Sequence, residues 1–244
     1  MDYIGEIGKK MVKKKFENWQ LLLDHAKSLG GQPVILDYGC GAGSMVEKFI
    51  DNGFETYGCD VVLRSDSDMV LKMNDQFHIP YQDEKFDLII SNQVVEHVHD
   101  LRTMISEFNR VLKPNGQAII LCPTSETVIE WHLMVPFVHW FNNYHFTQKC
   151  LLRLYATLGL GRGHSANKGD WVTDRFSFLQ NFTRYRSRAE IIKNFNLENL
   201  SVQIITHEFY YKKYSISVVA KLLLNRITLP YVVGSVFRIA KKSV

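Results

Sequence analysis

Short apolar runs alternate with helix-type patterns over the first half of the chain. In the helix-type segments, 45–50 and 101–112, apolar residues recur every three to four positions. The apolar runs have the length and the bounding turns of buried strands, and they occupy residues 34–36, 55–60, 86–91 and 117–122. Strands that alternate with amphipathic helices predict an α/β fold, in which helices cover both faces of a parallel sheet.

The pattern changes after Pro123. Residues 124–186 hold 12 aromatic side chains and four histidines, with helical stretches but no clear strand alternation, so we expect an inserted cap. Beyond the cap we expect a helix capped by Ser187, a strand over 200–206, an amphipathic helix over 215–226 and a last strand over 231–240. The predicted divisions are a basic, amphipathic N-terminal segment (1–33), a core (34–123), the cap (124–186) and a C-terminal part of the core with a basic tail (187–244).

Composition supports one globular domain enlarged by this insertion. Of the 244 residues, 46% are hydrophobic and 22% charged, which excludes a disordered chain. The four cysteines form no CxxC pair and are too sparse for a disulfide framework. No stretch has the pattern of a signal peptide or a membrane span. We therefore expect a cytoplasmic protein.

Charge is distributed unevenly along the chain, although the net charge is only +4. Residues 1–16 carry five lysines, and residues 209–244 carry seven lysines and arginines without an acidic residue, whereas the middle is acidic. An acidic body argues against nucleic acid as a partner. The basic ends contain apolar stripes, including Leu22 and Leu23, that favour two structures: helices lying on the inner face of an anionic membrane, or helices packed on the domain.

A glycine-rich loop follows the first predicted strand. Residues 34–44 read VILDYGCGAGS, in which a hydrophobic strand leads into a turn that opens a helix. Glycines there let a ligand approach the backbone closely. A dinucleotide fingerprint requires GxGxxG, but Ser44 replaces its third glycine and Asp37 precedes the first. A carboxylate repels phosphate and attracts an ammonium group, so the loop favours a cationic ligand over a pyrophosphate.

These residues resemble the class I S-adenosylmethionine-dependent methyltransferases, whose first motif is D-x-G-x-G-x-G after a strand. Four further segments resemble the family in the same order: the acid Asp60 at the end of the second strand, DQFHIPY at 75–81, FDLIISN followed by EHV at 86–98, and LKPNGQ at 112–117. The resemblance implies a Rossmann-like, seven-stranded, mostly parallel sheet with an antiparallel last strand. Only fourteen residues separate Asp60 from Asp75, so the unit between them is expected to be abbreviated.

The same resemblance implies S-adenosylmethionine as the cofactor and a set of residues that bind it. Asp60 would accept hydrogen bonds from the ribose hydroxyls, and Asp75 would face the adenine amino group. The complete predicted cofactor site is Asp37, Gly39, Gly41, Gly43, Asp60, Asp75, Gln76 and Asn92.

Two histidines are candidate catalytic bases. His97 follows the fourth strand near the expected cofactor site, where Glu96 and Asp100 are alternatively helix-capping acids. His132 lies in the cap, where an acid, a histidine and a P-x-x-x-W stretch resemble a smaller group of bacterial methyltransferases encoded with surface-polysaccharide genes. The spacing of the cap histidines matches no zinc motif, so we expect no metal.

The expected function is methyl transfer from S-adenosylmethionine to a small-molecule acceptor covered by the cap. An aromatic cap suits a sugar ring, which stacks on aromatic side chains, about as well as an isoprenoid quinone, which requires apolar walls. The likeness within the cap favours a hydroxyl of a sugar or glycan intermediate. Two alternatives remain open: an isoprenoid quinone or other lipid-like acceptor, and a catalytically silent scaffold with the same fold.

Overall fold

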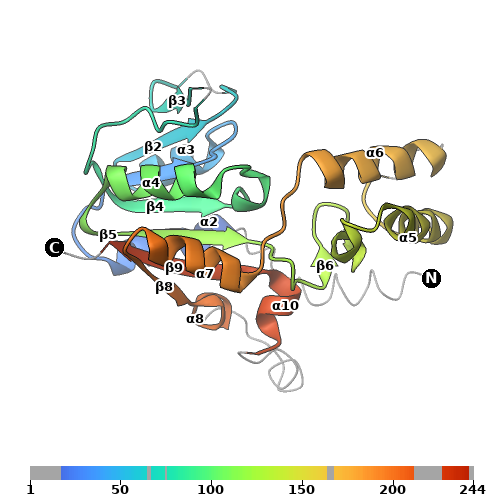
Figure 1. The fold of residues 1–244 in the computed structure, drawn as a ribbon. Coiled ribbons are helices and arrows are strands. Elements are labelled where there is room, and N and C mark those ends of the chain that lie inside the picture. The colour runs from blue at the N-terminus through green and yellow to red at the C-terminus, as the bar shows by residue number, and fades with distance from the viewer. Residues whose placement is uncertain (1–17, 65–66, 75, 164–167, 212–226, 242–244) are drawn as a thin grey trace.

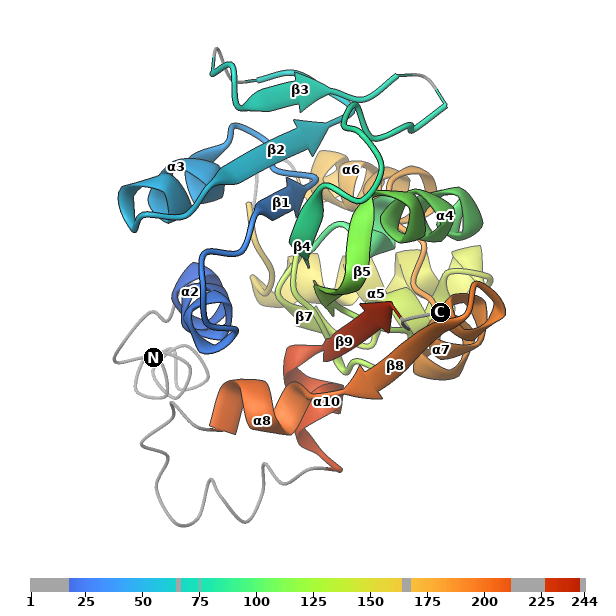
Figure 2. The ribbon, with the colours of Figure 1, turned by 90° about the vertical axis from the view of Figure 1, so that its left-hand side faces the viewer.

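The computed structural model describes residues 18–64, 67–74, 76–163, 168–211 and 227–241. Seven strands form one sheet in the order β3-β2-β1-β4-β5-β9-β8, visible from the end in Figure 2. The strands are β1 (Ile35–Tyr38), β2 (Thr56–Asp60), β3 (Val70–Lys72), β4 (Phe86–Asn92), β5 (Leu112–Cys122), β8 (Leu200–Ile204) and β9 (Ser235–Lys241). Neighbouring strands are parallel except that β9 is antiparallel to both β5 and β8. The predicted fold class is confirmed.

Helices cover both faces of the sheet because its central strands are apolar on both sides. Alternate residues of each strand point to opposite faces, so Ile35 and Leu36 belong to separate hydrophobic clusters. One face packs against α4 (Leu101–Val111) and α7 (Arg188–Leu197). The other packs against α2 (Asn18–Ser28), α3 (Ser44–Asp51), α8 (Thr206–Tyr211) and α10 (Leu229–Val233). Burial of each large aliphatic side chain stabilises the fold by about 1.5–3 kcal/mol.

Side-chain caps define where two of these helices begin. Ser187 Oγ accepts a hydrogen bond from the Glu190 N–H at 3.1 Å, which confirms the predicted cap of α7. Asp100 caps α4 by accepting from the N–H groups of Arg102 and Thr103. Both caps satisfy amide groups that have no partner within the first turn of a helix.

The apolar face of α2 packs on the sheet. Leu21, Leu22, Leu23 and Ala26 are all buried in the cluster formed with β1, β4 and β5. This stripe therefore covers the domain instead of lying on an external surface. The N-terminal lysines, and the helix predicted over 215–226 with its basic residues, lie outside the described residues.

Three predicted boundaries differ from the structure. The last strand begins at Ser235 instead of residue 231, because Pro230 lies in the first turn of α10 and Gly234, with φ 85°, ends that helix. The strand expected over 200–206 ends at Ile204, and α8 begins at Thr206. Strand β5 begins at Leu112 instead of residue 117. Phe86 of β4 pairs with Leu112 and Leu88 pairs with Gln117, so the strand includes the predicted turn as an irregularity in the register.

The abbreviated unit after Asp60 is present as predicted. Strand β3 has only three residues, and in the described part of the connection before it, residues 61–64 and 67–69, no helix forms.

The described residues between 124 and 186 form a layer beyond the end of the sheet, seen beside it in Figure 1. Short strands β6 (Ile129–Glu130) and β7 (Val135–Pro136), which the sequence pattern did not indicate, precede the 3-10 helix η2 (Val138–Phe141), α5 (His145–Leu158) and α6 (Lys168–Asn181). Leu152, Trp171 and Leu179 belong to a separate small core between these elements. Among the described helices, none has the length and apolar character needed to cross a membrane.

Candidate active site

The glycine loop joins β1 to α3, and its conformation requires glycine. Gly39, Gly41 and Gly43 have φ values of 76°, 58° and 82°. At Gly39 packing is a second requirement, because an added Cβ would lie 2.5 Å from Val94 Cγ2. At Gly41 an added Cβ would meet no atom within 4 Å. The loop therefore contacts the segment after β4 through Gly39 and leaves open space at Gly41.

Asp60, at the end of β2, is tied to this loop. Its Oδ2 accepts a hydrogen bond from the Gly41 N–H at 2.8 Å, and its Oδ1 accepts one from the Val62 N–H at 3.1 Å. The Gly39 N–H donates to the carbonyl of Cys59 at 2.8 Å. These bonds hold the predicted ribose-binding acid beside the loop, with carboxylate lone pairs left for a ligand.

Asp37, on β1, carries a buried carboxylate without a full set of partners. The residue is 3% exposed, and its Oδ2 has no hydrogen-bond partner among the described residues. Burial, and then the charge of Asp60, raise the pKa of Asp37 to about 8. A buried carboxylate in this state favours binding of a cation that supplies both charge and hydrogen bonds.

A cavity of about 250 Å³ connects Asp37 to the loop and to α2. It brings together three predicted site residues, Asp37, Gly39 and Asn92, with residues that the sequence analysis did not single out. Asn18 donates to Asn92 Oδ1 at 3.1 Å, which places the start of α2 at the cavity. The complete lining is Asn18, Trp19, Asp37, Gly39, Cys40, Ser44, Met45, Lys48 and Asn92.

Of the two predicted cofactor residues after β3, the structure describes only Gln76, and it is not brought to this cavity. Gln76 is exposed in the loop after β3, where its N–H donates to Asn74 Oδ1 at 3.0 Å, and it does not line the cavity. Asp75 lies outside the described residues.

The segment after β4 is held in place by the chain that leaves the cap. The Arg186 guanidinium donates to the carbonyls of Val95, Val98 and His99 at 3.1, 2.7 and 3.0 Å. The Arg184 N–H donates to the carbonyl of Glu96 at 2.6 Å. Residues 95–99 are thus fixed between the glycine loop, which contacts neighbouring Val94, and the cap.

This arrangement brings the two candidate histidines together. The ring centroids of His97 and His132 are 5.2 Å apart, although the residues are far apart in sequence. Glu96 is 1% exposed and joins them, with its Oε1 3.9 Å from His132 Nε2. Burial raises the pKa of Glu96 to about 7. We call these three residues the Glu96–His97–His132 cluster.

Glu130 and Tyr185 orient His132. The His132 Nδ1 lies 2.7 Å from Glu130 Oε1, and the Tyr185 hydroxyl donates to the same oxygen. Glu130 Oε2 accepts from the Leu133 N–H at 2.6 Å. Burial lowers the pKa of His132, but the hydrogen bond and charge of Glu130 raise it more, so the net shift is upward. Glu130 stood in the sequence likeness without an assigned role, and no signal marked Tyr185.

A polar cavity of about 580 Å³ adjoins the cluster through Tyr185. It lies between η2 and the end of α6 and contains amide, guanidinium, hydroxyl and aromatic groups. Its lining comprises Ser125, His139, Trp140, Asn142, Asn143, Leu179, Gln180, Thr183, Arg184 and Tyr185. Such groups match a ligand with several hydroxyls and one flat face.

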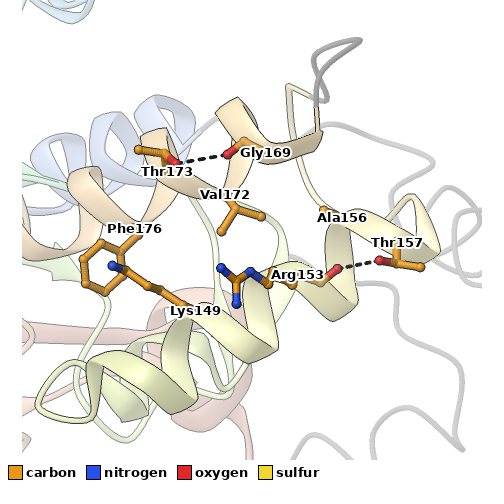
Figure 3. Close-up of a pocket in the computed structure, with 8 residues that line it drawn as sticks. All are labelled: Lys149, Arg153, Ala156, Thr157, Gly169, Val172, Thr173 and Phe176. Atoms are coloured by element: carbon orange, nitrogen blue, oxygen red, sulfur yellow. Dashed lines mark hydrogen bonds between the residues drawn. The ribbon is translucent and has the colours of Figure 1, made fainter.

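Another cavity, of about 540 Å³, lies on the cap between α5 and α6 (Figure 3). The Lys149 ammonium is 4.3 Å from the centroid of the Phe176 ring, and Arg153 extends into the same space. The residues that line it include none from the glycine loop or from the Glu96–His97–His132 cluster.

Comparison with solved structures supports the same architecture. An S-adenosylmethionine-dependent methyltransferase from Mesorhizobium loti is similar with a TM-score of 0.55 and 12% identity, over 93% of this chain and 99% of that one. The YcgJ protein from Bacillus subtilis is similar with a TM-score of 0.53 and 15% identity, over 93% and 99%. At these identities the likeness shows the fold.

Sequence relatives cover only part of the chain. An uncharacterized protein of Methanocaldococcus jannaschii is 29% identical over 131 residues, 52% of each chain. The mitochondrial ubiquinone biosynthesis O-methyltransferase of Rattus norvegicus is 30% identical over 129 residues, 47% of this chain and 37% of the relative. That of Pasteurella multocida is 29% identical over 140 residues, 47% and 55%. The match thus spans about half the length of these relatives or less.

A family model described as a methyltransferase domain matches residues 11–202, which include the glycine loop, Asp60, the Glu96–His97–His132 cluster and the cap. The chain belongs to this methyltransferase family, and its cofactor is S-adenosylmethionine.

Proposed function

We propose that this protein transfers the methyl group of S-adenosylmethionine to a hydroxyl of a small sugar-like acceptor bound beneath the cap. The observation that carries the proposal is the polar cavity that adjoins the Glu96–His97–His132 cluster, in which Glu96 and His97 follow β4 next to the glycine loop and His132 comes from the cap. Parallel α/β sheets bind ligands at the carboxyl ends of their strands, where these features lie.

The residues around the glycine loop fit the cofactor. The unpartnered Oδ2 of Asp37 suits the ammonium of the methionine part, because a cation relieves the cost of the buried charge. Asp60 suits the ribose, and the open backbone at Gly41 leaves room beside it. When bound, S-adenosylmethionine supplies an electrophilic methyl group on a sulfonium.

The acceptor oxygen must lose its proton as its bond to the methyl carbon forms and the carbon–sulfur bond breaks. A buried carboxylate and two imidazoles beside the acceptor cavity promote this loss by supplying negative charge and nitrogen lone pairs. Alignment of the acceptor with the methyl group remains the larger requirement, and the walls of the cavity provide it.

The polar lining favours a sugar over an apolar acceptor. Trp140 offers a face on which a sugar ring stacks, and Asn143 and Arg184 offer polar groups for hydrogen bonds to its hydroxyls. A guanidinium also suits a phosphate, as in a nucleotide-linked sugar.

The test is methyl transfer from labelled S-adenosylmethionine to separated fractions of a cell extract, followed by identification of the labelled product. We expect label in sugar or nucleotide-sugar fractions, with at least tenfold less in Arg184→Met and little change in Arg153→Met, which alters the separate cavity of Figure 3. Cofactor binding without transfer to any fraction would instead indicate a silent scaffold.

A quinone is the second candidate acceptor, because several relatives are named ubiquinone biosynthesis O-methyltransferase. Exposed apolar side chains on the cap, including Phe137, Trp140 and Phe146, suit a lipid-like molecule. Label recovered only in quinone fractions would overturn the sugar assignment and support this one.

A further inference from the structure

Three metal-ligating side chains face one another in the Glu96–His97–His132 cluster. One carboxylate oxygen and one nitrogen from each imidazole all lie within 4.8 Å of one another. The sequence predicts no metal, because the spacing of the cap histidines matches no zinc motif and no cysteine pair supports one. The structure instead combines one cap histidine with two residues that follow β4.

The hydrogen bonds of the two histidines determine which nitrogen of each ring is available. His97 Nδ1 lies 2.6 Å from the carbonyl oxygen of Phe182, which can only accept, so Nδ1 carries the proton. His132 Nδ1 likewise donates to the Glu130 carboxylate at 2.7 Å. In the neutral form of both rings, Nε2 therefore presents a lone pair. Metal-binding histidines characteristically donate their other N–H to a carbonyl or carboxylate in this way.

Glu96 supplies the negative charge. It is buried, and neither of its carboxylate oxygens has a hydrogen-bond partner among the described residues. A carboxylate and two imidazole lone pairs are all acceptors, and leaving the buried carboxylate of Glu96 without a donor is costly. A cation at their centre satisfies all three.

We propose that Glu96, His97 and His132 bind a divalent transition-metal ion. Two nitrogen ligands and one carboxylate favour ions such as Mn²⁺, Co²⁺ or Zn²⁺ over Mg²⁺ and Ca²⁺, which prefer oxygen. Ligand atoms around one such ion lie about 2.0–2.2 Å from it, so the side chains must close together by roughly 1 Å on binding. His97 is exposed, which leaves an open side for further ligands.

The metal gives the proposed methyl transfer a specific mechanism, and this part rests on the proposed function. An acceptor hydroxyl in an open coordination position would have a lowered pKa, so its proton would pass to solvent as its oxygen bonds to the methyl carbon and the carbon–sulfur bond breaks. His132 Nε2 cannot hold a metal and a proton together, so His132 acts as a ligand instead of a general base.

Metal binding is tested on tag-free, chelator-treated protein, without cofactor or acceptor, by Co²⁺ absorption spectroscopy and by Zn²⁺ calorimetry. We expect one equivalent to bind, with affinity reduced more than tenfold in Glu96→Gln, His97→Ala and His132→Ala. The exposed His145→Ala is the matched control and should bind as the wild type does. Circular dichroism and S-adenosylhomocysteine binding establish that each variant is folded.

Glu130→Gln is a second variant that removes no ligand. Loss of the carboxylate that accepts the hydrogen bond from His132 Nδ1–H should lower the metal affinity about 10- to 100-fold. Failure of the wild type to bind one equivalent would overturn the inference. So would binding that persists unchanged in all three ligand variants.

Activity separates this inference from the proposed function. Sugar methylation that survives a chelator unchanged, in protein shown to be metal-free, would overturn the catalytic role of the metal and leave the sugar assignment standing. One equivalent of bound metal without any methylated sugar would overturn the sugar assignment and leave the metal site standing.

Discussion

The protonation of Asp37 links the stability of the fold to the cofactor binding that we propose for this residue. Its pKa is raised from 3.8 to about 8, so between these values the folded chain retains a proton that the unfolded chain has lost. The free energy of unfolding therefore falls as the pH rises through this window. The fall is bounded at about 1.4 kcal/mol per pH unit for one group.

We predict that Asp37→Asn removes this pH dependence and weakens the cofactor site. In urea unfolding experiments without cofactor, the free energy of unfolding of the variant should fall less between pH 5 and 8 than that of the wild type. Calorimetry at pH 8 should show S-adenosylhomocysteine binding more than tenfold weaker, about 1.4 kcal/mol. Equal pH slopes in the two proteins would contradict the buried, proton-retaining carboxyl.

Two glycines of the loop are required for different reasons, the backbone conformation alone at Gly41 and also close packing at Gly39, and alanine substitutions separate these reasons. Gly41→Ala should lower the free energy of unfolding by about 1 kcal/mol through the left-handed backbone alone, since no atom lies within 4 Å of the added Cβ. Gly39→Ala adds a collision with Val94, worth about 1–3 kcal/mol more. In a double-mutant cycle by urea unfolding, Val94→Ala should recover part of the Gly39→Ala loss; strictly additive effects would refute the collision.

At the scale of elements, the cap of α4 predicts a pH-dependent contribution to stability. Asp100 accepts hydrogen bonds from the Thr103 side chain and from the N–H groups of Thr103 and Arg102, which lower its pKa. Its contribution is present above the unfolded pKa of 3.8 and is lost as the pH falls through the lower folded pKa. Asp100→Ala should therefore cost about 1 kcal/mol at pH 7, with a smaller difference in thermal melts below pH 3.8. A difference that grows in acid would exclude this cap.

The segment after β4 depends on Arg186 for its position. A lysine keeps the charge of Arg186 but cannot reach its three carbonyl partners at once. Arg186→Lys should therefore lower the free energy of unfolding by about 1–3 kcal/mol. Hydrogen exchange in residues 94–100 should accelerate. Arg102→Lys, an exposed change in the adjoining helix, is the control and should leave exchange unaltered.

For the whole molecule, the two sites predict separate regions of protection in hydrogen exchange. S-adenosylhomocysteine should slow exchange in residues 37–48 and at the start of α2, because Asn18 and Trp19 line the cavity with the loop. The walls of the cavity between α5 and α6 should be unaffected (Figure 3). Protection confined to α5 and α6 would place the cofactor elsewhere than the glycine loop.

Local sequence determined the alternation of strands and helices, the caps and the glycine loop, because each depends on residues close together in the chain. The glycine turn between β1 and α3 and the Ser187 cap agree with expectation for this reason. The prediction of the last strand was wrong at residues 231–233. Their side chains are typical of a strand, but Pro230 lies in the first turn of α10 and these residues continue that helix.

Tertiary structure alone decided how the candidate active site is assembled. Glu96 read as a capping acid, and His97 and His132 as independent bases, because sequence spacing contains no information about the path of the cap. The pairing of Arg184 and Arg186 with the segment after β4 brings these residues together, and packing then leaves Glu96 buried without a donor. Burial and long-range contact, which arise only on folding, convert three ordinary polar residues into one cluster.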